Sequence, residues 1–373
     1  MPLRKLLSLG KKWVLERCNL MLRAVFSRLP IRNHVFFYTI RADGKLLENS
    51  KCVYDALEDV EKVVVARMLP HPVLLKPKIY YHLLTSRVIV TDDYLRYLRH
   101  TQLREGQKVV QIWHACGAFK RFGLDAPSLL SPQEEKRTHS QYAAVCVSSE
   151  QVRPYYAQAF GIGMDKVQAL GTPRTDALLN EKTCHAMREE LLRRHPEMRG
   201  KQIYLYTPTF REKDGKPCYY DPQIEWDALD SALTDGELFV IRRHPIMKDS
   251  YLGDQSFRHI VDCTDEPTSQ LLTAASVVVT DYSSVIFDAI LCGAPLVFYC
   301  PDFDAYERNF YLDYPQDLPG PTVFQAQELP EVMRSVCQNP PLEKLSAFRS
   351  AQLGACDGHA AQRVAQLVRS YLD

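Results

Sequence analysis

Two histidines in this chain could do acid–base chemistry, because each follows an apolar run that predicts a buried strand. His114 ends the segment "KVVQIWH" (108–114), and His244 ends "ELFVIRRH" (237–244). A neutral imidazole suits proton abstraction near pH 7. We therefore identify His114 as a candidate general base. A purely structural histidine is the alternative at both positions.

Cations and hydroxyls follow the ends of the same set of predicted strands. They are Lys120, Arg121, Thr209, Arg211, Arg243, Ser283 and Ser284. Guanidinium, ammonium and hydroxyl groups near a helix start suit a phosphate. The simpler alternatives are a surface salt bridge for Arg211, solvated charges at 120–121, and helix capping by Asp281 and the two serines.

Acidic residues stand near these positions without the spacing of a metal site. Asp288 lies one helical turn beyond Ser284, where it orients His244, binds a ribose hydroxyl or is simply exposed. Asp302 and Asp304 form an Asp-x-Asp pair similar to that of metal-dependent nucleotide-sugar enzymes, but no other acid or histidine stands beside them at ligand spacing. We expect the pair to be loop and helix-capping residues, and we expect no obligatory metal and no cofactor.

Apolar runs and helix-length segments alternate along most of the chain. Strands are predicted at 34–40, 87–92, 108–114, 143–149, 202–209, 237–245, 259–263, 276–281 and 295–300. Helices are predicted at 51–66, 132–141, 149–160, 223–234, 266–275 and 283–292. This alternation is typical of parallel sheets covered on both faces. The two sets of strands predict two doubly wound, Rossmann-like α/β domains, with the ligand in a cleft between them.

Length and composition fit a globular protein of two domains. The chain has 373 residues, of which 46% are hydrophobic and 24% are charged. Its 46 Lys and Arg residues against 45 Asp and Glu give no basic excess, so we expect no nucleic-acid partner. The eleven cysteines contain no C-x-x-C pair, which favours reduced thiols. We expect one domain at 33–195 and a second at 196–373 that includes the C-terminal helices.

The first 32 residues differ from the rest in charge. Eight Lys or Arg residues stand among leucines and Trp13, against the single acid Glu16. No apolar run reaches the roughly 20 residues that span a bilayer. A basic amphipathic helix of this kind suits an anionic membrane surface. The alternative is an ordinary helix that packs on its own domain.

Five motifs together resemble the CDP-glycerol glycerophosphotransferase family of teichoic-acid primases and polymerases. They are "WHACGAFKRFG" (113–123), "GTPRTD" (171–176), "YTPTFR" (206–211), "RRHP" (242–245) and "TDYSSVIFDAILCGAPLVFYCPDFDAY" (280–306). The resemblance extends from about residue 34 to 330 and implies two Rossmann-like domains that face a cleft, as in GT-B glycosyltransferases. One motif departs from the family: its Trp-His-Gly-Thr-Pro reads Trp-His-Ala-Cys-Gly here (113–117), which is compatible with a different alditol or acceptor.

The resemblance implies transfer of glycerol-phosphate or ribitol-phosphate from CDP-glycerol or CDP-ribitol to a lipid-linked or polysaccharide acceptor, with release of CMP, in teichoic-acid or capsule synthesis. His114 is then the general base for the acceptor hydroxyl, and His244 stabilises charge on the leaving CMP. Arg211 binds the diphosphate. The rest of the expected substrate-binding set is Lys120, Arg121, Thr209, Arg243, Ser283, Ser284 and Asp288. The implied location is peripheral, at the cytoplasmic face of the cell membrane.

Two other classes of function fit the same patterns. One is a GT-B glycosyltransferase that uses a nucleotide sugar, and the other is a non-enzymatic, membrane-surface nucleotide-binding scaffold. Glycerol and ribitol donors share the same cytidine diphosphate, so the motifs leave the alditol, the acceptor and the number of units added open.

Overall fold

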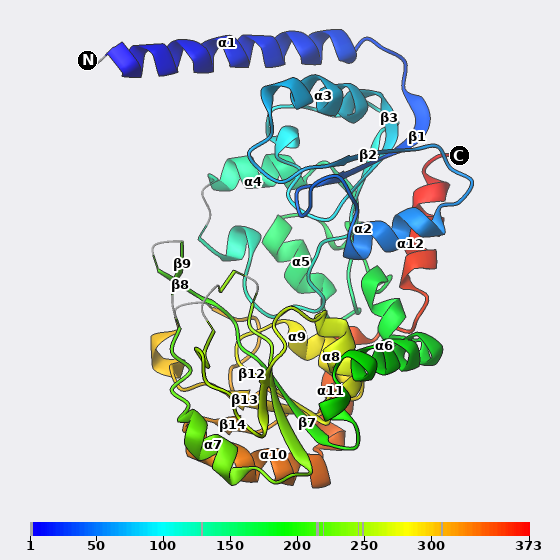
Figure 1. Ribbon diagram of the computed structural model, residues 1–373. Helices are drawn as coiled ribbons and strands as arrows, with labels where there is room; N and C mark the ends of the chain where they lie inside the picture. The colour runs from blue at the N-terminus through cyan, green and yellow to red at the C-terminus, as the bar shows by residue number, and fades with distance from the viewer. Residues whose placement is uncertain are drawn as a thin grey trace. The chain divides into compact units, whose positions relative to one another are not determined.

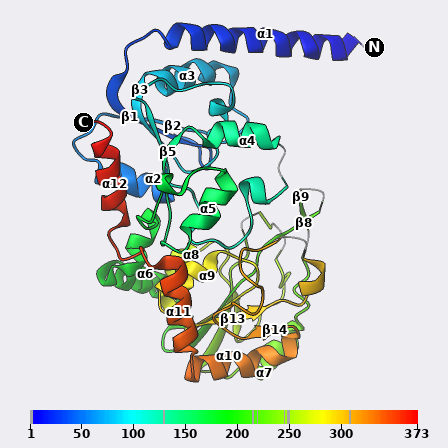
Figure 2. The ribbon, with the colours of Figure 1, turned by 180° about the vertical axis from the view of Figure 1, so that it is seen from behind.

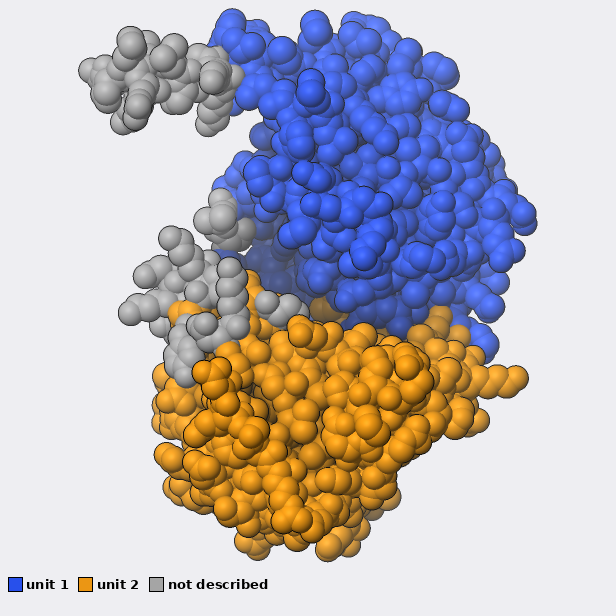
Figure 3. Space-filling view, in the orientation of Figure 1, with its two compact units in different colours: residues 1–114, 122–174, 359–373 blue, residues 115–121, 175–358 orange. Residues whose placement is uncertain are grey.

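Among the described residues, two parallel sheets of six strands each carry the fold. The computed structural model describes residues 3–127, 130–213, 216–218, 220–244, 246–247, 250–306 and 309–373, so Pro245 of the predicted strand 237–245 lies outside the described residues. The chain divides into two compact units, distinguished by colour in Figure 3. Unit 1 comprises residues 1–114, 122–174 and 359–373, and unit 2 comprises residues 115–121 and 175–358.

Strands and helices alternate through most of unit 1 (Figure 1). Its strands are β1 (Arg32–Thr39), β2 (Lys62–Ala66), β3 (Ser86–Thr91), β4 (Lys108–Gln111), β5 (Tyr142–Cys146) and β6 (Val167–Gln168). Its helices are α1 (Leu3–Phe26), α2 (Glu48–Ala56), α3 (Lys76–Thr85), α4 (Pro132–His139), α5 (Arg153–Phe160) and α12 (Ala360–Ser370). The central strands β1 and β3 are buried over most of their length, as expected for a parallel sheet covered on both faces.

The strand order of unit 1 is β2-β1-β3-β4-β5-β6, and all neighbours are parallel. The order changes direction between β1 and β3, because the chain first moves outward to β2 and then returns to the other side of β1. Such a switch point leaves a crevice beyond the carboxyl ends of the two strands, where α/β sheets bind ligands. Arg41 follows β1, and Asp92 and Asp93 follow β3, so these three residues lie at the switch point of unit 1.

The C-terminal part of helix α1 packs on α3 within unit 1 (Figure 1). Phe26 contacts Tyr81 edge-on, with ring centroids 5.5 Å apart, and Arg104 donates hydrogen bonds to the carbonyl oxygens of Ser27 and Leu29 at the end of the helix. The side chains of 1–12, which include half of the basic residues of the segment 1–32, lie outside the described part. No helix in the described part of the chain is both long and apolar enough to cross a membrane.

Helix α12 contributes to the core of unit 1, although it comes from the C-terminal end of the chain. Val364, Ala365 and Val368 are fully buried among residues of β1, β3 and β4. Arg369 donates a hydrogen bond to the carbonyl oxygen of Ala56 at the end of α2 (2.9 Å). The compact units therefore differ from the domains expected at 33–195 and 196–373. The apolar stripe of a helix predicts burial, but it does not say which sheet the helix covers.

Unit 2 has a second alternating set of elements (Figure 2). Its strands are β7 (Gln202–Thr207), β8 (Arg211–Lys213), β9 (Lys216–Cys218), β10 (Glu237–Ile241), β11 (Ile260–Asp262), β12 (Val277–Thr280), β13 (Leu296–Tyr299) and β14 (Thr322–Val323). Its helices are α6 (Glu181–Arg194), α7 (Trp226–Ala232), α8 (Thr268–Ala274), α9 (Val285–Leu291), α10 (Leu329–Gln338) and α11 (Leu342–Leu353). Strands β8 and β9 form a separate antiparallel pair.

The parallel sheet of unit 2 has the order β11-β10-β7-β12-β13-β14. This is the doubly wound order in which the first strand lies at the centre and the sheet grows outward in both directions. Its switch point lies between β7 and β12, which pair in the register Val277–Tyr204 to Thr280–Thr207. The polar segments after these two strands, 208–211 and 281–284, therefore leave the same edge of the sheet side by side.

The predicted elements agree with the structure except in one segment of unit 1. All nine predicted strands form. The predicted helix 51–66 is wrong in its second half, because α2 ends at Ala56 and Lys62–Ala66 forms the edge strand β2. All eleven cysteines lie among the described residues; none of them forms a disulfide, and five are buried.

Candidate active site

The backbone before His114 has a conformation that few non-glycine residues adopt. Trp113, two residues beyond the end of β4, has φ +46°. Its N–H donates to the side-chain oxygen of Gln111 (2.9 Å), and its carbonyl oxygen accepts from the Asn49 amide (2.8 Å). Strained backbone persists only where the surroundings hold it, and it is common at functional sites. Gln111 and Asn49 therefore determine where His114 leaves the sheet.

The His114 imidazole turns its Nδ1 atom toward two oxygen acceptors. Nδ1 lies 3.1 Å from the carbonyl oxygen of Asp92 and 3.5 Å from a carboxylate oxygen of Asp93. Neither oxygen can donate a hydrogen bond, so the ring proton belongs on Nδ1 and the lone pair on Nε2. The Trp113 ring stacks on the imidazole with centroids 4.4 Å apart. The side chain is still 29% exposed, which leaves room for a substrate hydroxyl.

Burial and the nearby Arg41 favour a neutral His114 ring. Burial lowers the pKa of His114 below its usual range, and the positive charge of Arg41 lowers this pKa further. Asp93 opposes both effects and raises the pKa. Arg41 lies 3.7 Å from the Asp93 carboxylate and 3.9 Å from that of Glu48. A neutral imidazole with an available Nε2 lone pair can accept a proton at pH 7.

Arg211 lies at the switch point of unit 2 in a cage of acids and aromatic rings. Its guanidinium binds Asp302 through two nitrogens (2.6 and 2.9 Å) and Asp281 through a third (2.9 Å). The rings of Tyr220, Tyr282 and Tyr306 lie 3.9, 5.0 and 5.3 Å from its central carbon. Burial would lower the pKa of Arg211, but the two carboxylates raise it above its ordinary value.

This environment gives Arg211 less freedom than the sequence suggested. Its side chain is only 10% exposed, and two carboxylates already neutralise it. The predicted contact with a diphosphate would require one of these ion pairs to open. Asp281 was expected to cap a helix, but it pairs with Arg211 and accepts a hydrogen bond from the Thr209 N–H (2.8 Å). Asp302, expected to be a loop or capping residue, provides the bidentate partner.

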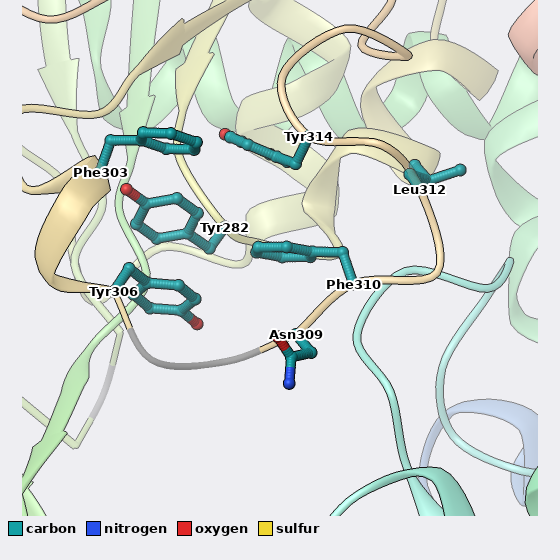
Figure 4. A pocket seen from close by; sticks show the side chains of 7 residues that line it. All are labelled: Tyr282, Phe303, Tyr306, Asn309, Phe310, Leu312 and Tyr314. Carbon is teal, nitrogen blue, oxygen red and sulfur yellow. The ribbon is translucent and has the colours of Figure 1, made fainter.

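An aromatic pocket of about 280 Å³ lies next to this cage (Figure 4). Its lining consists of Tyr282, Phe303, Tyr306, Asn309, Phe310, Leu312 and Tyr314. Tyr282 and Tyr306 stack with centroids 3.6 Å apart and belong to both the pocket and the cage. The pocket is thus built on the same segments as the Arg211 cluster, and strand patterns in the sequence gave no sign of it.

His244 lies in the segment that follows β10 of unit 2. Its Nδ1 atom accepts a hydrogen bond from the backbone N–H of Ile246 (3.2 Å). A neutral ring that accepts at Nδ1 carries its proton on Nε2, so this side chain presents a donor. Burial lowers the pKa of His244, and the charges of Arg242 and Lys120 lower it further. The ring is therefore neutral at pH 7, which suits a hydrogen bond to a phosphate oxygen.

The two arginines before His244 have different environments. Arg243 is buried, binds the Asp262 carboxylate (3.1 Å) and donates to the carbonyl oxygen of Met247 (2.9 Å). The Nε atom of Arg242 is buried and has no hydrogen-bond partner among the described residues. Burial lowers the pKa of Arg242. The structure thus points to Arg242, which the sequence reasoning did not select, as a partly exposed cation beside His244.

The hydroxyls of the two serines after β12 are held by fewer contacts than the charged groups described above. The Ser283 hydroxyl accepts from the N–H of Val285 (3.3 Å), and Ser284 is the exposed N-cap residue of α9 without a side-chain capping bond. Asp288 is partly buried on the same helix. In the described residues, no group of three or more histidines, cysteines or acids could hold a metal ion.

The family described as CDP-Glycerol:Poly(glycerophosphate) glycerophosphotransferase matches residues 22–370. The chain belongs to this family. The resemblance seen in the five sequence motifs is thereby confirmed, over a longer stretch than the motifs covered.

Relatives and solved structures agree with this membership. The chain is 32% identical to a teichoic acid ribitol-phosphate primase of Bacillus spizizenii over 310 residues, which cover 78% of this chain and 77% of the relative. It is 29% identical to a poly(ribitol-phosphate) polymerase of the same species over 361 residues, but it spans only 57% of that protein's length. The wall teichoic acid polymerase TagF has the same fold: the TM-score is 0.77 at 20% identity, with 99% of this chain and 97% of the TagF chain covered.

In unit 2, Gly117 stands where the glycerophosphotransferase motif Trp-His-Gly-Thr-Pro has its proline. Gly117 has φ +66°, and a Cβ atom there would lie 2.3 Å from the ring of Phe287. Only glycine fits this position. The following residues run antiparallel to a later segment, where Lys120 bridges Phe310 and the Arg121 side chain donates to the carbonyl oxygen of Phe310 (3.0 Å). Lys120 and Arg121, expected to bind substrate, thus also attach this segment to the loop that lines the aromatic pocket.

Proposed function

We propose that this protein transfers an alditol phosphate from a CDP-alditol to a hydroxyl of a teichoic-acid or related cell-envelope acceptor. The acceptor oxygen attacks the phosphorus on the alditol side of the diphosphate. The new P–O bond forms as the P–O bond to CMP breaks, and CMP carries away the electron pair of that bond. The acceptor's proton passes to a base and then to water. Fixed donors and cations can stabilise the charge that spreads over the phosphate oxygens.

The geometry of His114 is the observation that carries this proposal. The residue stands in the family's Trp-His motif, and its Nδ1 faces the acceptors of Asp92 and Asp93. Its Nε2 is therefore available to take the proton of the acceptor hydroxyl. No cofactor enters this step, because the leaving group is already activated in the donor.

His244 and Arg242 are the groups that we assign to the donor diphosphate. His244 presents an Nε2–H donor because its Nδ1 accepts from Ile246. Arg242 is partly exposed beside His244, so its guanidinium can pair with an anionic oxygen of the diphosphate. The hydroxyls of Ser283 and Ser284 remain further donors in the proposal, as do the cations Lys120 and Arg121.

The described part of α1 supports action at an anionic membrane surface. Its face away from α3 exposes large apolar side chains: Trp13 (58%), Val14, Leu20, Met21 (62%) and Val25. Arg17 lies on the same helix, 5.1 Å from the Trp13 ring. Exposed apolar groups with adjacent cations are the features by which interfacial helices bind lipid. We propose that α1 brings the enzyme to the cytoplasmic membrane face, where a lipid-linked acceptor is reached.

Donor profiling tests the proposed reaction. The purified protein is incubated with CDP-glycerol, CDP-ribitol and several UDP-sugars together with a teichoic-acid primer, and release of CMP or UDP is measured. We expect CMP release from at least one CDP-alditol. We expect His114→Ala to reduce this release by about 10²- to 10⁴-fold, the usual contribution of a general base. UDP release alone would indicate a glycosyltransferase. No turnover of any donor would overturn the proposal and leave a nucleotide-binding scaffold.

A further inference from the structure

A carboxylate that no sequence motif singled out stands behind the proposed base. Asp93 follows β3 at the switch point of unit 1 and lies 3.5 Å from His114 Nδ1. Its backbone neighbour Asp92 supplies the carbonyl oxygen at 3.1 Å. The two residues approach the ring from the same side, because β3 and β4 are parallel neighbours and both chains leave the sheet at one edge.

We infer that Asp93 is a positioning residue for His114, and that the Asp92 carbonyl and the Asp93 carboxylate together fix the Nδ1–H tautomer. The inference rests on the proposed role of His114 as the general base. When Nε2 takes the acceptor's proton, the ring becomes an imidazolium, and the Asp93 carboxylate stabilises this charge. Asp93 itself keeps no proton, since the imidazolium proton leaves to water after the phosphoryl transfer. The pair therefore works as an oriented acid–base dyad.

The surroundings of Asp93 fit a charge that is held in place. Its carboxylate is 16% exposed and lies 3.7 Å from Arg41, which follows β1 across the switch point. The backbone of the next residue contributes too, because Asp93 Oδ1 accepts a hydrogen bond from the N–H of Tyr94 (2.7 Å). The Asp93 carbonyl oxygen accepts from the Thr91 hydroxyl and the Gln111 amide, both at 3.0 Å. These four contacts fix the residue without occupying the ring's Nε2 side.

Asp92 has a different role from its neighbour. Its side chain is buried and accepts from the Ser50 hydroxyl (2.8 Å), and burial raises its pKa to about 6. The second carboxyl oxygen of Asp92 has no hydrogen-bond partner among the described residues. Only the backbone of Asp92 contacts the histidine. The charged groups that influence His114 are thus Arg41, Asp93 and Glu48, and the first two have opposite effects on its pKa.

Two substitutions with opposite expected effects test the inference. Asp93→Asn keeps the shape but removes the charge, so it should lower kcat/KM for CMP release by roughly 10²-fold, within the range of general-base contributions. It should also move the acid limb of the kcat/KM profile to lower pH, because Asp93 raises the pKa of His114. Arg41→Gln should move that limb to higher pH. In a His114→Ala background, Asp93→Asn should have no further effect.

Nitrogen NMR of the full-length protein with labelled histidine gives a readout that does not depend on turnover. The His114 signals, assigned by their loss in His114→Ala, should report the Nδ1–H tautomer in the wild type and a lower pKa in Asp93→Asn. Asp55→Asn is the matched control, since Asp55 is an exposed partner of Lys51 on α2 and should leave both readouts unchanged. An Nε2–H tautomer, or an unmoved pKa in both Asp93→Asn and Arg41→Gln, would overturn the inference. Absence of turnover in the wild type would instead count against the proposed function.

Discussion

Replacing Arg211 should damage the stability of unit 2 before it reveals anything about catalysis. Arg211→Met keeps most of the side-chain volume but removes the positive charge between Asp281 and Asp302. Asp281 is 1% exposed, so its carboxylate would remain buried without its ion-pair partner. Breaking a buried pair from one side typically costs about 3–5 kcal/mol. Such a loss corresponds to roughly 10²- to 10⁴-fold more frequent opening of unit 2.

Hydrogen exchange by mass spectrometry measures this loss separately for each unit. Peptides that contain β7 and β12 should exchange faster in Arg211→Met, while peptides that contain β3 and β4 of unit 1 should not change. A peptide-resolved assay is preferable to a single melting curve, since two units need not unfold as one. Adding Asp281→Asn to Arg211→Met should recover part of the protection, because the uncompensated charge is then removed.

The controls separate support of the fold from contact with substrate. Arg258→Met removes an exposed arginine of the same unit, paired with the exposed Asp235, and should leave exchange unchanged. Arg242→Met should keep wild-type exchange but reduce CMP release by on the order of 10²-fold. If Arg211→Met exchanged like Arg258→Met and yet lost turnover, the support role would be refuted. The diphosphate contact predicted from the sequence would then be correct.

Three further predictions concern the histidines and α1. His244→Gln should keep more turnover than His244→Ala, because the glutamine amide can donate from the position of Nε2; equal losses would contradict the donor role. Burial lowers the pKa of His82 to about 4. The free energy of unfolding of unit 1, measured in urea, should therefore be highest above pH 6.5 and decrease as the pH falls towards 4. In His82→Phe this decrease should be smaller. Trp13→Ser with Met21→Ser should weaken binding to anionic vesicles at least about tenfold, unlike Leu342→Ser, which changes an equally exposed residue of unit 2.

Most of the fold could be predicted because its strands are short apolar runs with polar ends. The main error, at 51–66, has a physical cause. The acidic residues of "YDALEDVEK" continue the helical pattern past Ala56, while "KVVVA" at 62–66 is too short to distinguish a strand from a helix by periodicity. β2 forms because its backbone pairs with β1, with Val35 opposite Lys62 and Thr39 opposite Ala66. That partner is 27 residues away in the sequence, so no local pattern contains it.

The candidate site could be predicted only in part, for a related reason. Residues that stand in motifs, such as His114 and His244, were identified by their position after a strand. Their surroundings were not, because Asp93 meets His114, and Asp302 meets Arg211, only through the order of the strands. Asp302 stands 91 residues from Arg211, and the two meet because β13 is separated from β7 by β12 alone. Residue type and spacing thus locate the edge of a sheet where chemistry occurs, while strand order decides which charges are neutralised there.

The two histidines show most clearly what strand order and backbone add to a motif. Each contacts one backbone atom through Nδ1, but the atoms differ: His114 faces the carbonyl oxygen of Asp92, and His244 faces the N–H of Ile246. The first contact requires a proton on Nδ1 and leaves a lone pair on Nε2, whereas the second requires the reverse. One ring can therefore accept a proton from a hydroxyl, and the other can donate a hydrogen bond to a phosphate oxygen. Because burial lowers the pKa of both rings, each keeps its assigned tautomer at neutral pH.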